Sequence, residues 1–326
     1  MSSGARSSLL GLVAIIFLAG SARAQAWLPP KGEAFFSINY GNFFTTKHYL
    51  GRGTDPGDNK ETDRGHIRGQ SVGFDLGYAL IDRLVISFGI PYMDTKYMGT
   101  EPHKELDGRT VPVDDGEYHG TFQDYRIDLR YQAVSGPMVV TPFVAAVIPS
   151  HSYTFFAHSA AGRDLHEYLV GVSSGGRLDR ILPGGYVQVK YSYAFVERVL
   201  GIKHDRSDAE LELGYFLASS LGVRAVGTWS YTHGGVVFRS GKDITDTLNP
   251  YHDQISHASA LIAGGGLSYA LSGSVDVSAT YLRSLGGRGG HKIDQALSFG
   301  LGWNFSPQQL ARRVFARKPH MGPEVQ

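Results

Sequence analysis

The stretch from Thr121 to Ala133 divides its side chains into two sets of opposite chemistry. The even-numbered residues from 124 to 130 are charged: Asp124, Arg126, Asp128 and Arg130. The odd-numbered residues from 125 to 131 are apolar or aromatic: Tyr125, Ile127, Leu129 and Tyr131. This period of two is the signature of a β-strand. A strand of a soluble sandwich turns its apolar face to the core, whereas a strand of a transmembrane barrel turns that face to lipid and its polar face to a lumen.

The same alternation recurs along the chain, which favours a barrel. We predict strands near residues 34–44, 67–78, 84–94, 121–133, 139–149, 165–175, 185–196, 209–218, 223–233, 258–270, 275–282 and 294–305. The last of them alternates clearly and ends on an aromatic residue, Phe305. The predicted fold is therefore all-β, an antiparallel transmembrane β-barrel of about 12 strands with up-and-down topology, formed by residues 25–305.

The N-terminus has the layout of a secretory signal peptide. Arg6 precedes an apolar run over residues 9–20, and Ala22-Arg23-Ala24 follows as a small-x-small cleavage pattern. The run is shorter than the ~20 residues that a transmembrane helix needs. We expect residues 1–24 to be removed and the mature chain to begin near Gln25. The chain is thus expected to be exported.

Composition agrees with an exported barrel in a Gram-negative bacterium. Mean hydropathy is −0.15, as expected when lipid-facing and lumen-facing residues alternate. The chain has no cysteine and a net charge of +1, so neither disulfides nor a nucleic-acid partner is expected. No linker divides the chain into two domains.

Residues 306–326 carry several basic side chains, and we predict a mostly disordered periplasmic tail with one helical turn near residues 309–315.

Connections between the predicted strands alternate in length. Short turns lie near residues 81–83, 134–137, 177–183, 219–222 and 271–273, and long polar loops lie near 45–65, 95–120, 150–164, 197–208, 234–256 and 283–293. This asymmetry is typical of outer-membrane barrels, with long loops outside the cell and both termini in the periplasm. Aromatic residues at the strand ends indicate two interfacial belts. The outer belt comprises Tyr40, Tyr92, Tyr193, Trp229, Tyr231 and Tyr281, and the periplasmic belt comprises Tyr78, Tyr131, Tyr215, Tyr269 and Trp303.

Several segments resemble one family. They are Ala26-Trp27-Leu28-Pro29-Pro30-Lys31-Gly32-Glu33 at the mature N-terminus, the turn over residues 77–84, the charged strand over residues 124–131, and the segment over residues 168–175. Together they resemble the outer-membrane putative transporters related to the phenol meta-pathway degradation protein. The chain departs from that pattern at Thr121-Phe122-Gln123-Asp124 and at Pro149-Ser150-His151. The resemblance implies a barrel that passes small, hydrophobic or aromatic compounds.

The predicted parities direct a set of charged residues into the lumen. The site residues that we expect there are Asp124, Arg126, Asp128, Arg130, Lys190, Glu210, Glu212 and Arg224; the same parities direct Asp75, Glu167 and Asp276 inward. Lys190 is expected to pair across the ladder with Glu210 or Glu212. These residues would line a constriction that filters solutes. Alternatively, they form a structural ion-pair network that fills a narrow barrel.

Histidines gather in or beside the long loops. Twelve of the 13 lie there: His48, His66, His103, His119, His151, His158, His166, His204, His233, His252, His257 and His291. Converging imidazoles would suit a transition metal, but no pair has a tight ligand spacing, and polar residues collect in loops in any barrel. The first loop also has an oxygen-rich cluster of the kind that binds Ca²⁺: Asp55, Asp58, Asn59, Glu61 and Asp63. A solvated loop explains that cluster equally, so the sequence assigns no metal site and no cofactor.

The sequence contains little that indicates catalysis. The chain has no Gly-x-Ser-x-Gly elbow and no phosphate-binding loop, and His166-Glu167 lacks the second histidine of a zinc hydrolase helix. We therefore expect no enzyme but a passive, porin-like outer-membrane channel. The alternatives are a non-conducting barrel whose long loops bind a ligand, partner or metal, and a barrel enzyme of lipid metabolism.

Expected partners are small solutes, outer-membrane lipid and lipopolysaccharide, and the barrel-assembly machinery through the last strand. The sequence gives no oligomeric state.

Overall fold

The computed structural model describes residues 26–49, 51, 61–63, 65–105, 107–238 and 248–315. The predicted signal peptide and residues 316–326 of the predicted tail lie outside the described residues. So do Asp55, Asp58 and Asn59 of the oxygen-rich cluster in the first loop.

Twelve long antiparallel strands form the fold, each joined to the next along the chain. They are β1 (Ala34–Tyr49), β3 (His66–Ile81), β4 (Leu84–Met98), the pair β5 (His119–Phe122) and β6 (Asp124–Tyr131), β7 (Met138–Pro149), β8 (Glu167–Arg177), β9 (Gly185–Val196), β10 (His204–Phe216), β11 (Leu221–Gly234), β12 (Ser259–Ala270), β13 (Val275–Arg288) and β14 (Gly290–Phe305). A two-residue strand, β2 (Glu61–Thr62), extends β1.

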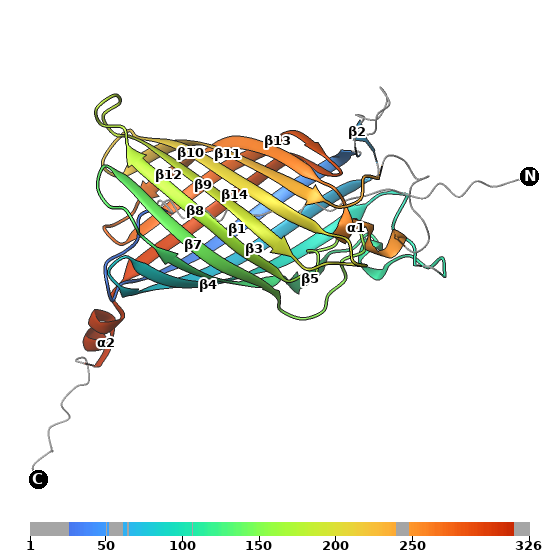
Figure 1. The fold of residues 1–326 in the computed structure, drawn as a ribbon, viewed down its shortest axis with the longest axis horizontal. Helices are drawn as coiled ribbons and strands as arrows, with labels where there is room; N and C mark the ends of the chain where they lie inside the picture. The colour runs from blue at the N-terminus through green and yellow to red at the C-terminus, as the bar shows by residue number, and fades with distance from the viewer. Residues whose placement is uncertain are drawn as a thin grey trace, which may run out of the picture.

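The last strand closes the barrel on the first. β14 pairs with β1 from Ala34 opposite Phe305 to Tyr49 opposite Gly290, so the sheet has no free edge along its length. The strands tilt strongly against the barrel axis, the short turns lie at one end, and the long loops lie at the other (Figure 1). The predicted 12-stranded up-and-down barrel is confirmed.

One wall position departs from regular pairing. β5 and β6 both pair with β4 and act as a single strand broken at Gln123. Tyr92 lies opposite Phe122 and Gly89 opposite Arg126, so two residues of β4 face three residues of the partner. Pro91 has no N–H to donate here, and its carbonyl accepts from the Gln123 amide at 2.9 Å. The result is a β-bulge, which bends the wall locally.

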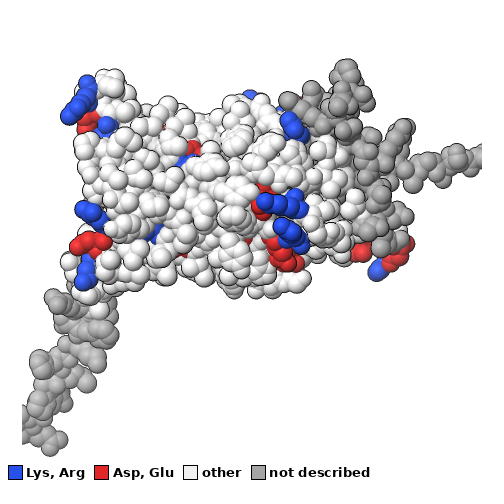
Figure 2. Space-filling model, in the orientation of Figure 1, with Lys and Arg blue, Asp and Glu red and all other residues white. Residues whose placement is uncertain are grey.

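The outer wall is apolar between two charged ends. Lysine, arginine, aspartate and glutamate gather at the two ends of the molecule, and the band between them carries few of them (Figure 2). Side chains of the predicted outward parity are exposed on this band, for example Ile127 at 41%, Leu129 at 40% and Phe299 at 52%. Because burying such a band in lipid removes it from water, the surface fits a bilayer.

Strands extend into several of the predicted long loops, notably in two connections. We predicted a long loop at residues 283–293, but β13 runs to Arg288 and β14 begins at Gly290, with Gly289 alone between them at a φ of 60°. β10 begins at His204, five residues before the predicted start at 209. In both places the glycine- or serine-containing sequence looks like a loop, but it continues the strands beyond the apolar band.

A helix, α2 (Pro307–Phe315), follows the last strand at the short-turn end (Figure 1). It is longer than the single helical turn that we predicted for this part of the tail. Among the described residues, no helix is long and apolar enough to cross a membrane.

Candidate functional site: the lumen and its two ends

Lumen-facing charges form a layer of ion pairs at mid-height. Lys190 Nζ lies 2.8 Å from Glu210 Oε1, so the cross-strand pair predicted between β9 and β10 is present. On β6, Asp128 accepts from Arg130 Nε at 2.6 Å, and Arg126 Nε lies 3.5 Å from the other carboxylate oxygen. Their opposite charges offset the cost of placing each of them in a confined lumen.

An aromatic ring supports two of these cations. Phe143 of β7 is buried and points inward. The Arg130 guanidinium carbon and Lys190 Nζ each lie 5.8 Å from its ring centroid. This distance is within the range of a cation–π contact. Phe143 therefore helps to hold both side chains in place.

Two further predicted residues, Glu212 and Arg224, form a second small group with Tyr186. Tyr186 Oη donates to Glu212 Oε1 at 2.7 Å, and Arg224 Nη1 lies 3.6 Å from Glu212 Oε2. Arg224 also donates to Thr280 at 2.7 Å. A void of about 50 Å³ separates this group from Lys190 and Glu210. Asp124, the last of the eight predicted residues, lines the lumen as well, so all eight lie inside the barrel.

A further network, closer to the long loops, was largely missed. Arg206 of β10 donates to both carboxylate oxygens of Glu167 at 3.0 and 2.8 Å and to Asp208 at 2.9 Å. Arg163 donates to the same Glu167. The prediction placed Arg206, Asp208 and Arg163 in loops. A signal existed for two of them, because Arg206 and Asp208 share the parity of Glu210 and Glu212.

Between these networks lies a cavity of the lumen, about 240 Å³ in volume. Its lining combines charges of both signs, such as Asp124, Arg126 and Lys190, with the apolar side chains of Val147, Leu165 and Leu169. Asp124 accepts a hydrogen bond from Tyr153 Oη at 2.6 Å, which ties the loop after β7 to the cavity wall.

The N-terminal segment enters the lumen from the short-turn end. Ala26 is fully buried, and its carbonyl accepts from Thr141 Oγ1 at 2.6 Å. The amide of Leu28 donates to Gln132 at 3.2 Å. Trp27 lies against Gly175 of β8, where a Cβ atom would come within 2.6 Å of its ring. The described part of this segment occupies the lumen at this end.

Loops cover the long-loop end. All four residues of the short helix α1 (His252–Ile255), in the connection between β11 and β12, are buried. The loop after β7 contributes buried Ala157 and Ala160, which pack against Val111 of the loop after β4. These inward-folded segments form a cap over the barrel, which we call the loop cap.

Imidazole rings are concentrated beneath this cap. Six histidines of the described residues are buried: His48, His103, His158, His204, His252 and His291. Five of them form a continuous series of ring contacts, with centroid separations of 5.3 Å for His252 and His103, 4.2 Å for His103 and His158, 5.7 Å for His158 and His48, and 4.3 Å for His48 and His291. Solvated loop histidines would not be buried in this way.

Asp114 organises part of the loop cap. Its carboxylate accepts backbone N–H groups from His103, His158 and Ser159 at 3.0–3.1 Å. Burial alone would raise the pKa of Asp114, but the hydrogen bonds that its carboxylate accepts from the His103 side chain and backbone outweigh burial and lower it. Burial lowers the pKa of His158 well below its usual value. The His158 ring is therefore neutral.

Comparison with known proteins supports the fold. Neither a protein family nor a curated protein matches the sequence. Among solved structures, an outer-membrane channel from Pseudomonas putida F1 is similar with a TM-score of 0.64 at 12% identity, over 87% of this chain and 99% of that chain. The NanC porin (TM-score 0.44, 10% identity, 82% and 98% covered) and a FadL homologue from Pseudomonas aeruginosa (TM-score 0.38, 8% identity, 93% and 100% covered) are more distant. The chain therefore has the fold of a bacterial outer-membrane β-barrel.

Proposed function

We propose that this chain is a narrow outer-membrane channel that admits small solutes to the periplasm. The cavity at mid-height of the lumen is the observation that carries this proposal, because a barrel filled only for stability has no need of it. The apolar outer band and the segregation of short turns from long loops support an orientation with long loops outside the cell and both termini in the periplasm.

The lining of the cavity suggests the kind of solute. Val147, Leu165 and Leu169 offer an apolar surface, and Arg126 and Lys190 offer positive charge beside it. A small molecule with an aromatic or apolar body and one polar or anionic group would satisfy both. This class includes the aromatic compounds that the sequence resemblance implies.

Single-channel recording tests the proposal. The refolded full chain in a planar bilayer should conduct in small steps, since the N-terminal segment and the loop cap narrow both ends. Benzoate should reduce this conductance at lower concentration than acetate does, because benzoate adds an aromatic body to the same carboxylate. A matched variant, Leu169→Asn, should weaken the block by benzoate and leave that by acetate unchanged. Equal block by both anions would contradict the proposed solute class.

A non-conducting barrel that uses its loops for binding is the second candidate, and the buried histidines under the loop cap favour it. Absence of conductance, both in the full chain and after the N-terminal segment is displaced, would support this candidate over the channel. Hydrolysis of phospholipid by the purified barrel would instead support the third, an enzyme.

A further inference from the structure

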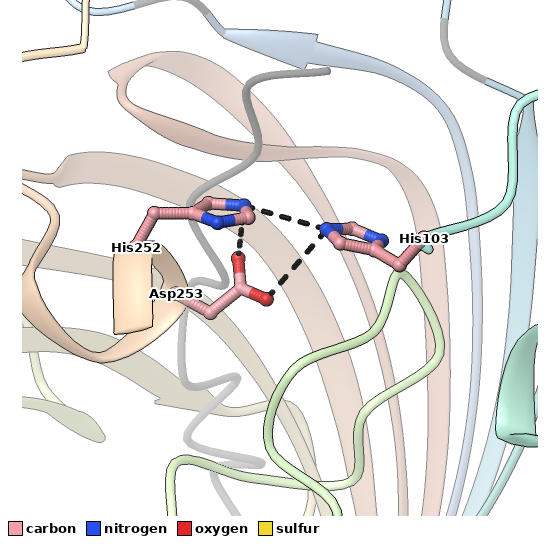
Figure 3. A group of neighbouring side chains, drawn as sticks. All are labelled: His103, His252 and Asp253. Carbon is pink, nitrogen blue, oxygen red and sulfur yellow. Dashed lines mark hydrogen bonds and ion pairs between the residues drawn. The ribbon is translucent and has the colours of Figure 1, made fainter. Parts of the chain in front are cut away.

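His103, His252 and Asp253 converge beneath the loop cap (Figure 3). His103 belongs to the loop after β4, whereas His252 and Asp253 belong to α1, 149 residues further along the chain. His103 Nε2 lies 3.4 Å from His252 Nε2 and 3.9 Å from Asp253 Oδ2, and His252 Nε2 lies 3.2 Å from Asp253 Oδ1. All three side chains are at least 96% buried, since their exposures are 4%, 0% and 2%.

The Asp114 carboxylate determines which ring nitrogen of His103 faces His252 and Asp253. Asp114 Oδ2 lies 3.2 Å from His103 Nδ1, and a carboxylate can only accept. Nδ1 therefore donates a hydrogen bond to Asp114, which leaves Nε2 as the ring nitrogen that can bind a metal ion on the side of His252 and Asp253. A carboxylate that orients a histidine through its far nitrogen is the usual second layer of a protein metal site.

The separations suit one bound ion. Two ligand atoms that bind Zn²⁺ at about 2.0–2.1 Å in tetrahedral geometry lie about 3.4 Å apart. The His103–His252 nitrogen separation has this value, and the two separations to Asp253 lie on either side of it. A direct N–H···N hydrogen bond between the rings would be longer than the usual ~2.7–3.2 Å.

A second observation lies beside this group, because His158 forms another set of neighbouring ligand atoms with His103 and Asp114. The His158 ring lies edge-on to the His103 ring at a centroid distance of 4.2 Å and is 1% exposed. Its Nε2 lies 2.9 Å from the Glu101 carbonyl and so donates to it, while Nδ1 is buried and has no hydrogen-bond partner among the described residues. Burying an imidazole nitrogen without a partner is costly.

We propose that His103, His252 and Asp253 bind one divalent transition-metal ion of the Zn²⁺ type, which clamps the loop after β4 to the loop between β11 and β12. Imidazole and carboxylate are ligands that such ions favour, and three protein ligands leave a fourth position for water or a solute. The inference does not depend on conductance, because it concerns the loop cap and not the lumen.

Calorimetric titration of the tag-free, chelator-treated full chain with ZnCl₂ tests the site. We expect one ion per chain. His103→Gln and Asp253→Asn should each weaken binding at least tenfold, and Asp114→Asn should weaken it roughly 10- to 100-fold through the orientation of His103. His66→Gln is the matched control, because His66 is an exposed histidine near the same end, and it should bind like the unaltered chain.

Co²⁺ as a probe supplies a measurement that needs no variant. Bound in this site, Co²⁺ should give the intense visible absorption of a tetrahedral complex, and ZnCl₂ should displace it. The weak spectrum of hydrated Co²⁺ would overturn the proposal. Absence of Zn²⁺ binding by the unaltered chain, or equal binding by the folded variants and the control, would overturn it as well.

Discussion

Arg206 forms a bidentate ion pair with Glu167 across an intervening strand. Its guanidinium donates to both oxygens of the Glu167 carboxylate, at 3.0 and 2.8 Å, although β10 and β8 are separated by β9. Both side chains are nearly buried, with exposures of 11% and 8%. The bidentate geometry is the strong form of this interaction, so the pair ties three adjacent strands together beside the cavity.

Glu167→Ala should destabilise the barrel by about 3–5 kcal/mol, because it leaves the buried Arg206 and Arg163 without their shared partner. Reversible unfolding in denaturant, followed by tryptophan fluorescence, measures this loss. Glu197→Ala is the control, because Glu197 pairs with His166 where both side chains are 49% exposed, and it should change stability by less than about 1 kcal/mol. Equal losses for both variants would contradict the assigned role of the buried network.

Lys190→Glu should shift ion preference toward cations. The substitution replaces the positive partner of Glu210 with a second carboxylate at a position that lines the cavity. The reversal potential across a KCl gradient reports this change. Arg177→Glu makes the same charge change in an exposed pair with Asp179 at the barrel end. A shift of equal size in that control would mean that the lumen position does not set selectivity.

Gly175→Val should raise conductance. A Cβ atom at Gly175 would lie 2.6 Å from two carbons of the Trp27 ring, so the larger side chain must displace the N-terminal segment from the lumen. Single-channel amplitudes of the variant and the unaltered chain give the comparison. Gly227→Ala serves as the control, because nothing lies within 4 Å of the added Cβ atom. An unchanged amplitude in Gly175→Val would show that the segment does not limit flow.

Ile127→Arg should reduce the free energy of unfolding in lipid by roughly 2–4 kcal/mol, since Ile127 faces outward from the middle of β6, opposite Phe88 of β4. Met138→Arg at the first position of β7 should cost only ~0–1 kcal/mol, because that position lies at the edge of the apolar band. Refolding into lipid vesicles over a range of urea concentrations measures both. Similar costs at the two positions would contradict the proposed depth of the band.

Much of the barrel was predictable because alternation is a local property. The charged and apolar parities of residues 124–131 assign each side chain to the lumen or the lipid face before any partner is known. The same rule predicted that Lys190 pairs with Glu210 or Glu212 once β9 and β10 were taken as neighbours, and the structure shows the pair with Glu210. It failed where strands rise beyond the apolar band, as at Arg206 and residues 283–293, since the outward face there no longer needs to be apolar.

The sequence by itself determined the strand count, the two faces of the wall and the lumen charges at mid-height, because strands that cross a lipid band must alternate apolar and polar side chains. Tertiary structure alone decided what fills the two ends. The placement of Ala26 and Trp27 in the lumen depends on contacts with Thr141 and Gly175, more than 100 residues away. The meeting of His103 with His252 likewise depends on how two loops fold over the barrel, and no local spacing encodes that juxtaposition.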